Sequence, residues 1–129
     1  KKVSRNKIIE MEMKKTGMLF SFCCVAPAII KNKKNLELRF FENVGSAIGL
    51  LFKISDDLID HEGNSKIAGK KTGKDQKKGK ATLISLLGYD NAVKYSEDLT
   101  INIDKKLQKY GSNSKKIKQT LEYILNRDR

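Results

Sequence analysis

Three aspartates, Asp56, Asp57 and Asp60, end a segment whose apolar residues recur every three to four positions. On a helix, with 100° per residue, these aspartates and Lys53 fall within about 100° of one another. Carboxylates this close repel one another unless a cation lies among them. All-oxygen carboxylate sites suit magnesium, which keeps several waters and often binds phosphate oxygens too. Taken alone, however, the triplet favours a solvated polar face over a metal site.

The segment that follows the aspartates is rich in lysine. Between Glu62 and Lys80 the chain has no hydrophobic periodicity and four glycines, so we expect a long loop. A metal-bridged polyphosphate would explain why the lysines directly follow the aspartates. The acids would hold the metal, the metal would hold the phosphates, and the ammonium groups would neutralise the remaining charge. By itself the segment would be a solvated basic loop. Its lysines are Lys66, Lys70, Lys71, Lys74, Lys77, Lys78 and Lys80.

The net charge suggests a second class of function. The 129 residues include 27 Lys and Arg against 15 Asp and Glu, a formal charge of +12, and a basic helical module could use it to bind nucleic acid. No aromatic residue interleaves with the loop lysines, so the loop offers no platform on which bases could stack. We therefore expect no nucleic acid partner and keep the basic module as the alternative from another class.

Lys15-Thr16-Gly17 lies where the first helical segment turns from polar to apolar. A lysine and a hydroxyl there could face a phosphate or a cationic intermediate, although a surface lysine is the simpler interpretation.

Cys23 and Cys24 are adjacent, about 3.8 Å apart at their α-carbons, which is too close for a relaxed disulfide. We expect free thiols on a buried helix in a reducing, cytoplasmic compartment. With His61 as the single histidine, zinc sites and His-dependent catalysis are disfavoured.

The elements that must position these residues are all helical. Apolar periodicity predicts helices over residues 6–30, 36–61, 81–87, 91–110 and 115–127, and Pro27 is expected to kink or shorten the first. The apolar run 18–30 is too short to span a bilayer, so we expect a core helix and no membrane insertion. The second helix gathers an apolar face opposite its aspartates. That face comprises Val44, Ala47, Leu51, Ile54 and Leu58.

In this order the motifs resemble the trans-isoprenyl diphosphate synthases, or polyprenyl synthetases, and most nearly the bacterial farnesyl diphosphate synthases (geranyltranstransferases). The resemblance covers only the C-terminal part of that family, because the first aspartate-rich motif and the Arg-Arg pair have no counterpart. It implies an all-α fold in which residues 1–129 form the C-terminal portion of a single helical-bundle domain. The residues that carry it are Lys15-Thr16-Gly17, 52–60, Gly69-Lys70, 73–76, 79–82 and 126–129.

The resemblance also implies a reaction. An allylic diphosphate, held through magnesium, ionises to an allylic cation and pyrophosphate; isopentenyl diphosphate attacks the cation and a proton is lost. The expected product is farnesyl diphosphate, with a geranylgeranyl or longer-chain product as the alternative. The complete enzyme is expected to be a homodimer, and the fragment alone is expected to be inactive.

Residue roles follow from the same resemblance. Asp56 and Asp60 would be magnesium ligands, and Asp57 would bind through metal-held water or orient the site. Lys53 stands where the family usually has Gln; it could help to hold diphosphate but would oppose magnesium. The remaining roles are contacts to the allylic diphosphate for Lys15 and Lys70, stabilisation of the cation for Thr16, and a basic group near the leaving group for Lys80.

Overall fold

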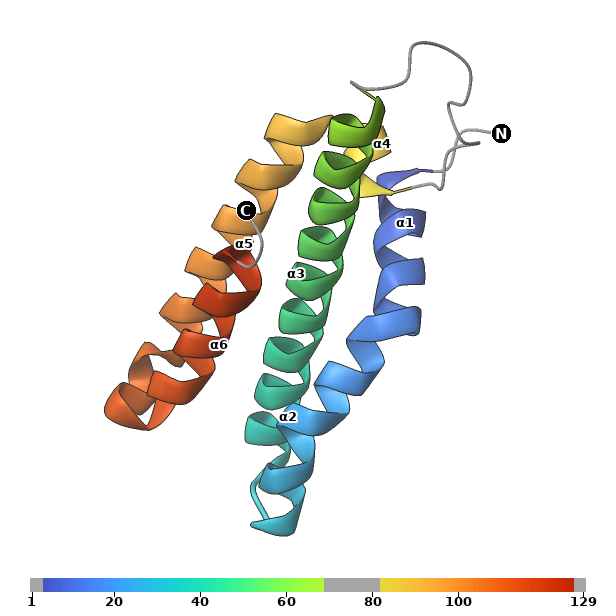
Figure 1. Ribbon diagram of the computed structural model, residues 1–129. Coiled ribbons are helices and arrows are strands. Elements are labelled where there is room, and N and C mark those ends of the chain that lie inside the picture. Colours follow the sequence, from blue (N-terminus) through green and yellow to red (C-terminus); the bar gives the residue numbers. More distant parts are fainter. Residues whose placement is uncertain (1–3, 69–81, 127–129) are drawn as a thin grey trace.

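A computed structural model of the chain describes residues 4–68 and 82–126, and every element in that part is helical (Figure 1). This confirms the all-α expectation. The elements are α1 (Arg5–Glu12), the π-helix η1 (Met13–Gly17), α2 (Met18–Ile30), α3 (Asn35–Ala68), α4 (Leu83–Leu87), α5 (Tyr89–Leu107), the 3₁₀-helix η2 (Gln108–Ser114) and α6 (Lys115–Asn126).

Helix α3 is the central element. The α1–η1–α2 segment lies along one side of it, and α5 and α6 lie along the other (Figure 1). The predicted apolar face is confirmed, since Val44, Leu51, Ile54 and Leu58 are almost completely buried and Ala47 is half-buried. Two core clusters form on α3. One includes Ile8, Leu50, Ile54, Leu58, Leu83, Ile84 and Ala92, and the other includes Val44, Ile48, Leu51, Ile103, Leu107, Leu121 and Ile124.

The first helical segment runs unbroken from Arg5 to Ile30, but with a change of winding that the sequence did not predict. At η1 the backbone N–H of Met18 donates to the carbonyl of Met13, five residues back, as in a π-helix. The shortening expected at Pro27 is not seen, because Pro27 lies in the last turn of α2 and the helix continues past it to Ile30. The change of winding lies instead at Met13–Gly17, which includes Lys15-Thr16-Gly17.

Helix α3 extends further than predicted. The loop expected from Glu62 begins no earlier than residue 69, because α3 continues to Ala68. Gly63 costs a helix roughly 1 kcal/mol relative to alanine, which lowers helix stability without ending the helix. Tyr89 of α5 supports this end, since its hydroxyl donates to a carboxylate oxygen of Glu62 and its ring lies 5.4 Å from that of His61. A contact 27 residues away in sequence is invisible to local patterns.

Helix α2 is not the buried core helix that its composition suggested. Only Val25 and Ala28 are buried, because among the described elements α3 alone covers much of its length. Cys23 is exposed and Cys24 half-buried, and both are free thiols. Burial raises the pKa of the Cys24 thiol, with a smaller contribution from Cys23. The exposed apolar side chains are Met18, Leu19, Phe22, Ile29 and Ile30.

The continuous helix from Arg5 to Ile30 is the one stretch of the described chain that is long and apolar enough to cross a membrane. Its most apolar 18-residue window has a mean hydropathy of 1.3 and is 17% buried. Length and composition alone do not separate a membrane span from a helix that other parts of a protein cover.

Candidate active site

A close contact between η1 and α3 sets where the Lys-Thr-Gly motif lies. A β-carbon on Gly49 would stand 2.7 Å from the α-carbon of Gly17, and one on Gly45 would stand 2.5 Å from the carbonyl oxygen of Phe20. The two backbones therefore touch where only glycine allows it. Single π-turns inside α-helices occur frequently at functional sites. This contact holds Lys15 and Thr16 alongside the part of α3 that leads to the aspartates.

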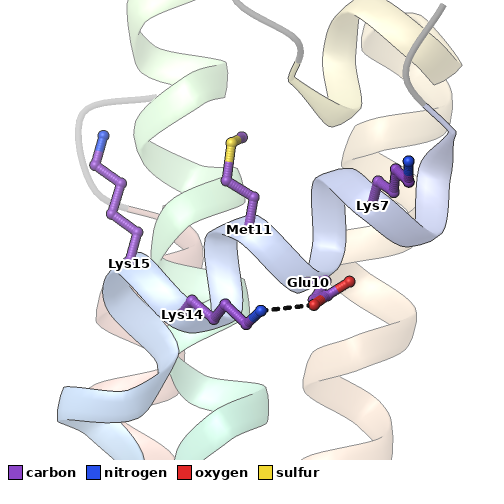
Figure 2. Close-up of a pocket in the computed structure, with 5 residues that line it drawn as sticks. All are labelled: Lys7, Glu10, Met11, Lys14 and Lys15. Carbon is purple, nitrogen blue, oxygen red and sulfur yellow. Dashed lines mark hydrogen bonds and ion pairs between the residues drawn. The ribbon is translucent and has the colours of Figure 1, made fainter.

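Lys15 is exposed and Thr16 is half-buried. Lys15 borders an open hollow of about 530 Å³, and its side chain and that of Met11 extend to the same side of the helix (Figure 2). Nearby, Lys14 donates to Glu10 at 2.7 Å, which lowers the pKa of Glu10 and raises that of Lys14. This pair is exposed to solvent, where ion pairs contribute little to stability. The hollow is lined by Lys7, Glu10, Met11, Lys14 and Lys15.

Lys53 and Asp57 form the tightest ion pair of the site. The Nζ of Lys53 donates to Oδ1 of Asp57 at 2.6 Å, one turn further along α3. The side chains are 20% and 10% exposed, so the pair is largely shielded from water. Burial lowers the pKa of Lys53, but the hydrogen bond to Asp57 and the charges of Asp57, Glu12 and Asp56 outweigh it, and the pKa rises above its ordinary value. Lys53 is therefore a permanent cation within the aspartate face.

The aspartates share a face of α3 as predicted, with Asp56 and Asp57 half-buried and Asp60 exposed. Within residues 4–68 and 82–126, no group of three or more His, Cys, Asp or Glu side chains is close enough together to hold a metal ion. One oxygen of Asp57 is engaged by Lys53. The donor set, all carboxylate oxygens, still has the chemistry that magnesium prefers. Lys70 and Lys80, the other predicted phosphate contacts, lie outside the described residues.

Glu12 is a site residue that the sequence analysis missed. It is the last residue of α1 and is only 5% exposed, and its Oε2 has no hydrogen-bond partner among the residues that the structure describes. Burial and the charge of Asp57 raise the pKa of Glu12, while the charges of Lys53 and Lys15 oppose the rise. A signal was available, since Glu12 follows the core residue Ile8 by four positions and so shares its buried face.

Ser55 ties the aspartate region to the C-terminal helix. Its side chain is fully buried, and its hydroxyl donates to the backbone carbonyl of Ile124 in α6 at 2.6 Å. Because Ser55 directly precedes Asp56, this bond fixes the rotation of α3 relative to α6 at the point where the carboxylates begin. The face of α3 that carries the aspartates is thus set by contacts on two sides, from η1 and from α6.

The comparisons with known proteins identify the family of the chain. The family model described as polyprenyl synthetase matches residues 1–124, and the chain belongs to that family. It is 32% identical to the farnesyl diphosphate synthase of Micrococcus luteus over all of this chain and 44% of that protein. It is also 32% identical to the farnesyl diphosphate synthase of Bacillus subtilis (strain 168), over 83% of this chain and 36% of that one.

Other relatives are named for a different product, geranylgeranyl pyrophosphate. Geranylgeranyl pyrophosphate synthase 6, mitochondrial, of Arabidopsis thaliana is 32% identical over 91% of this chain and 35% of that protein. The chain thus spans less than half the length of these relatives. The family likeness therefore makes the chain homologous to prenyltransferases and leaves the product length open.

Proposed function

We propose that the complete protein is a magnesium-dependent prenyltransferase that condenses an allylic diphosphate with isopentenyl diphosphate. In this reaction the carbon–oxygen bond of the allylic diphosphate breaks, and pyrophosphate leaves with the electron pair. The terminal carbon of isopentenyl diphosphate then bonds to the allylic cation, and a proton is lost. The observation that carries the proposal is the aspartate face of α3, held between η1 with its Lys-Thr-Gly motif and the end of α6.

The residues of this chain would divide the work by charge. Asp56 and Asp60 would hold magnesium directly, and Asp57 would bind through metal-held water or orient the site. Bound magnesium would supply the positive charge that stabilises the leaving pyrophosphate. Lys15 would contact the diphosphate from η1, and Lys70 and Lys80 would do so from the lysine-rich segment. Lys53 adds a positive charge that is already present beside the aspartates before any ligand binds.

The apolar surface of α2 supports the same proposal. An allylic cation survives only where water is excluded. Met18, Leu19 and Phe22 follow the Lys-Thr-Gly motif directly and are exposed in this chain. Together with the hydroxyl of half-buried Thr16, they would form part of a dry wall next to the diphosphate. The rest of that wall would come from the remainder of the complete protein.

We further propose farnesyl diphosphate as the product and a cytoplasmic homodimer as the working form. The farnesyl diphosphate synthases of M. luteus and B. subtilis support this product. The geranylgeranyl pyrophosphate synthases among the relatives support the alternative. Chromatography of the products formed from dimethylallyl diphosphate and isopentenyl diphosphate separates the two, because the geranylgeranyl product carries one more five-carbon unit.

The decisive experiment on the site is Asp56→Ala in the complete protein. Turnover should fall by about 10² to 10³, the usual cost of removing one element of transition-state electrostatics. Thermal stability should change little, because removing one of several clustered carboxylates relieves repulsion. The matched control is Asp98→Ala on the exposed surface of α5, which should keep normal turnover. Near-normal turnover in Asp56→Ala would reject the site assignment.

A further inference from the structure

The buried oxygen of Glu12 is an unusual feature of the described molecule. A carboxylate oxygen buried without a hydrogen bond destabilises a protein, because the oxygen has lost its water and gained no donor. Among residues 4–68 and 82–126, Glu12 Oε2 has no such bond, and Glu12 is 5% exposed at the junction of α1 and η1. A polar group kept at such a cost calls for a partner that is present in another state of the site.

Lys53 is the group best placed to be that partner. Its ammonium has three protons, and the structure shows one donated to Asp57. Gly17 of η1 touches Gly49 of α3, and the two helical segments run in opposite directions (Figure 1). Glu12 comes about one turn before Gly17 and Lys53 about one turn after Gly49, so the two residues lie at the same level of the packed helices. The ammonium is carried on a flexible four-carbon stem. In the structure this largely buried ammonium is bonded to Asp57, and Glu12 is a second carboxylate near it.

A divalent cation at the aspartate face would disturb this arrangement. The ammonium of Lys53 would lie against the cation, and like charges at that distance repel strongly in a partly buried site. Asp57 would be drawn toward the cation or its waters and would release the ammonium. A lysine at position 53 is compatible with magnesium when an anion receives its ammonium group. The diphosphate is one such anion, and Glu12 is one that the chain itself supplies.

We propose that Glu12 is a positioning residue that accepts Lys53 from Asp57 when a divalent cation and a diphosphate occupy the site. This inference rests on the proposed function. In the metal-free state Lys53 neutralises Asp57, and Glu12 Oε2 accepts no hydrogen bond from the part of the chain that the structure describes. In the loaded state Lys53 bonds to Glu12, and Asp57 serves the metal. Lys53 is thus the counter-ion of Asp57 without metal and the counter-ion of Glu12 with metal, so its charge does not oppose metal binding.

The test is a double-mutant cycle on the complete protein with Mn²⁺ and inorganic pyrophosphate as the probe. Free Mn²⁺ is measured by electron paramagnetic resonance against a protein-free titration. Glu12→Gln should weaken Mn²⁺ binding roughly tenfold, within the range of typical coupling between sites. In the Lys53→Gln background the same substitution should change binding less than twofold, because no displaced ammonium remains. Glu10→Gln is the matched control, as Glu10 pairs with Lys14 on the same segment but is exposed.

Each outcome is informative. If Glu12 is purely structural, Glu12→Gln will weaken Mn²⁺ binding equally in both backgrounds. That result, or no effect of Glu12→Gln in the native background, would overturn the inference. Either result would leave the proposed function standing. Failure of the native protein to bind Mn²⁺ with pyrophosphate would reject the proposed function and this inference with it. If Glu12→Gln alone unfolds, Glu12→Gln/Lys53→Gln carries the test and must bind as Lys53→Gln does. Unfolding of that double variant too would make Glu12 structural and overturn the inference.

Discussion

Gly17 of η1 lies directly on Gly49 of α3, so closely that a β-carbon on Gly49 would stand 2.7 Å from the α-carbon of Gly17. The contact is backbone to backbone, with no flexible side chain that could yield. Gly49 precedes Lys53 by four residues, which is about 6 Å along a helix. Because neither glycine carries a side chain, the two backbones pack in direct contact. This contact fixes the Lys-Thr-Gly motif relative to the beginning of the aspartate face.

We expect Gly49→Ala to destabilise the protein by about 1–3 kcal/mol, because the added methyl group must push two packed helices apart. Gly63→Ala, in the same helix, is the control: nothing lies within 4 Å of a β-carbon there, and alanine should stabilise the helix by about 0.5–1 kcal/mol. Urea denaturation of both variants measures the difference. Equal stability of the two variants would show that the contact is looser than described.

The central part of the fold follows from sequence because its signal is local. The three-four spacing of Val44, Leu51 and Leu58 predicts one buried face of α3, and the aspartates fall on the opposite side as expected. The gap between the first two predicted helices is a turn in the structure: the N–H of Lys33 donates to the carbonyl of Ala28, and Asn32 adopts a left-handed conformation. These features need only helical periodicity and short-range hydrogen bonds.

The features that escaped prediction depend on contacts between distant segments. Residues 61–68 have no local pattern that predicts the continuation of α3. The contact that supports this part of the helix comes from Tyr89 of α5, whose hydroxyl donates to Glu62. The π-turn at Met13–Gly17 accompanies packing against Gly49, which pattern counting does not see. The neighbours of Glu12, Lys14 and Lys15, are typical of a polar surface, whereas the spacing of Glu12 from Ile8 places it inside.

Ser55→Ala tests the bond that orients the aspartates. Removing the hydroxyl takes away the buried hydrogen bond that Ser55 donates to the carbonyl of Ile124, which should cost about 1 kcal/mol of unfolding free energy. The control is Thr120→Ala, whose exposed hydroxyl bonds only within its own helix, to Lys116, and should have little effect. Thermal unfolding followed by circular dichroism compares them. A Ser55→Ala protein as stable as Thr120→Ala would mean that α6 is held by its apolar contacts alone.

Glu12→Gln should change how the stability of the metal-free protein depends on pH. Burial raises the pKa of Glu12 above its ordinary value of 4.5, so the folded protein holds this proton longer than the unfolded chain. Stability therefore falls as pH rises from about 4.5 through the folded pKa, so a penalty is present at neutral pH. Glu12→Gln removes this penalty, so the variant should be more stable than the native protein at pH 7, and the advantage should shrink toward pH 4.

Glu10→Gln provides the opposite sign on the same segment. The hydrogen bond and charge of Lys14 lower the pKa of Glu10, so its contribution is present above the ordinary pKa and is lost as pH falls. This variant should gain no stability at pH 7, and because Glu10 is fully exposed any loss should fade in salt. Urea unfolding at pH 4, 5, 6 and 7 is the measurement. Parallel pH profiles for Glu12→Gln and Glu10→Gln would contradict the buried environment assigned to Glu12.

The 129-residue chain alone should not catalyse prenyl transfer, although it carries the aspartate face. The family resemblance calls for two aspartate-rich motifs around the diphosphate, and this chain supplies one, so the leaving group would be held from one side only. The exposed apolar side chains of α2, among them Met18 and Phe22, would also leave an allylic cation open to water. Incubation with dimethylallyl diphosphate, isopentenyl diphosphate and magnesium should yield no longer prenyl product, while the complete protein under the same conditions should. Circular dichroism must first show that the chain is helical, so that inactivity cannot be ascribed to unfolding. Measurable turnover by the folded 129-residue chain would mean that one aspartate face and one wall of the cavity are enough to ionise the substrate.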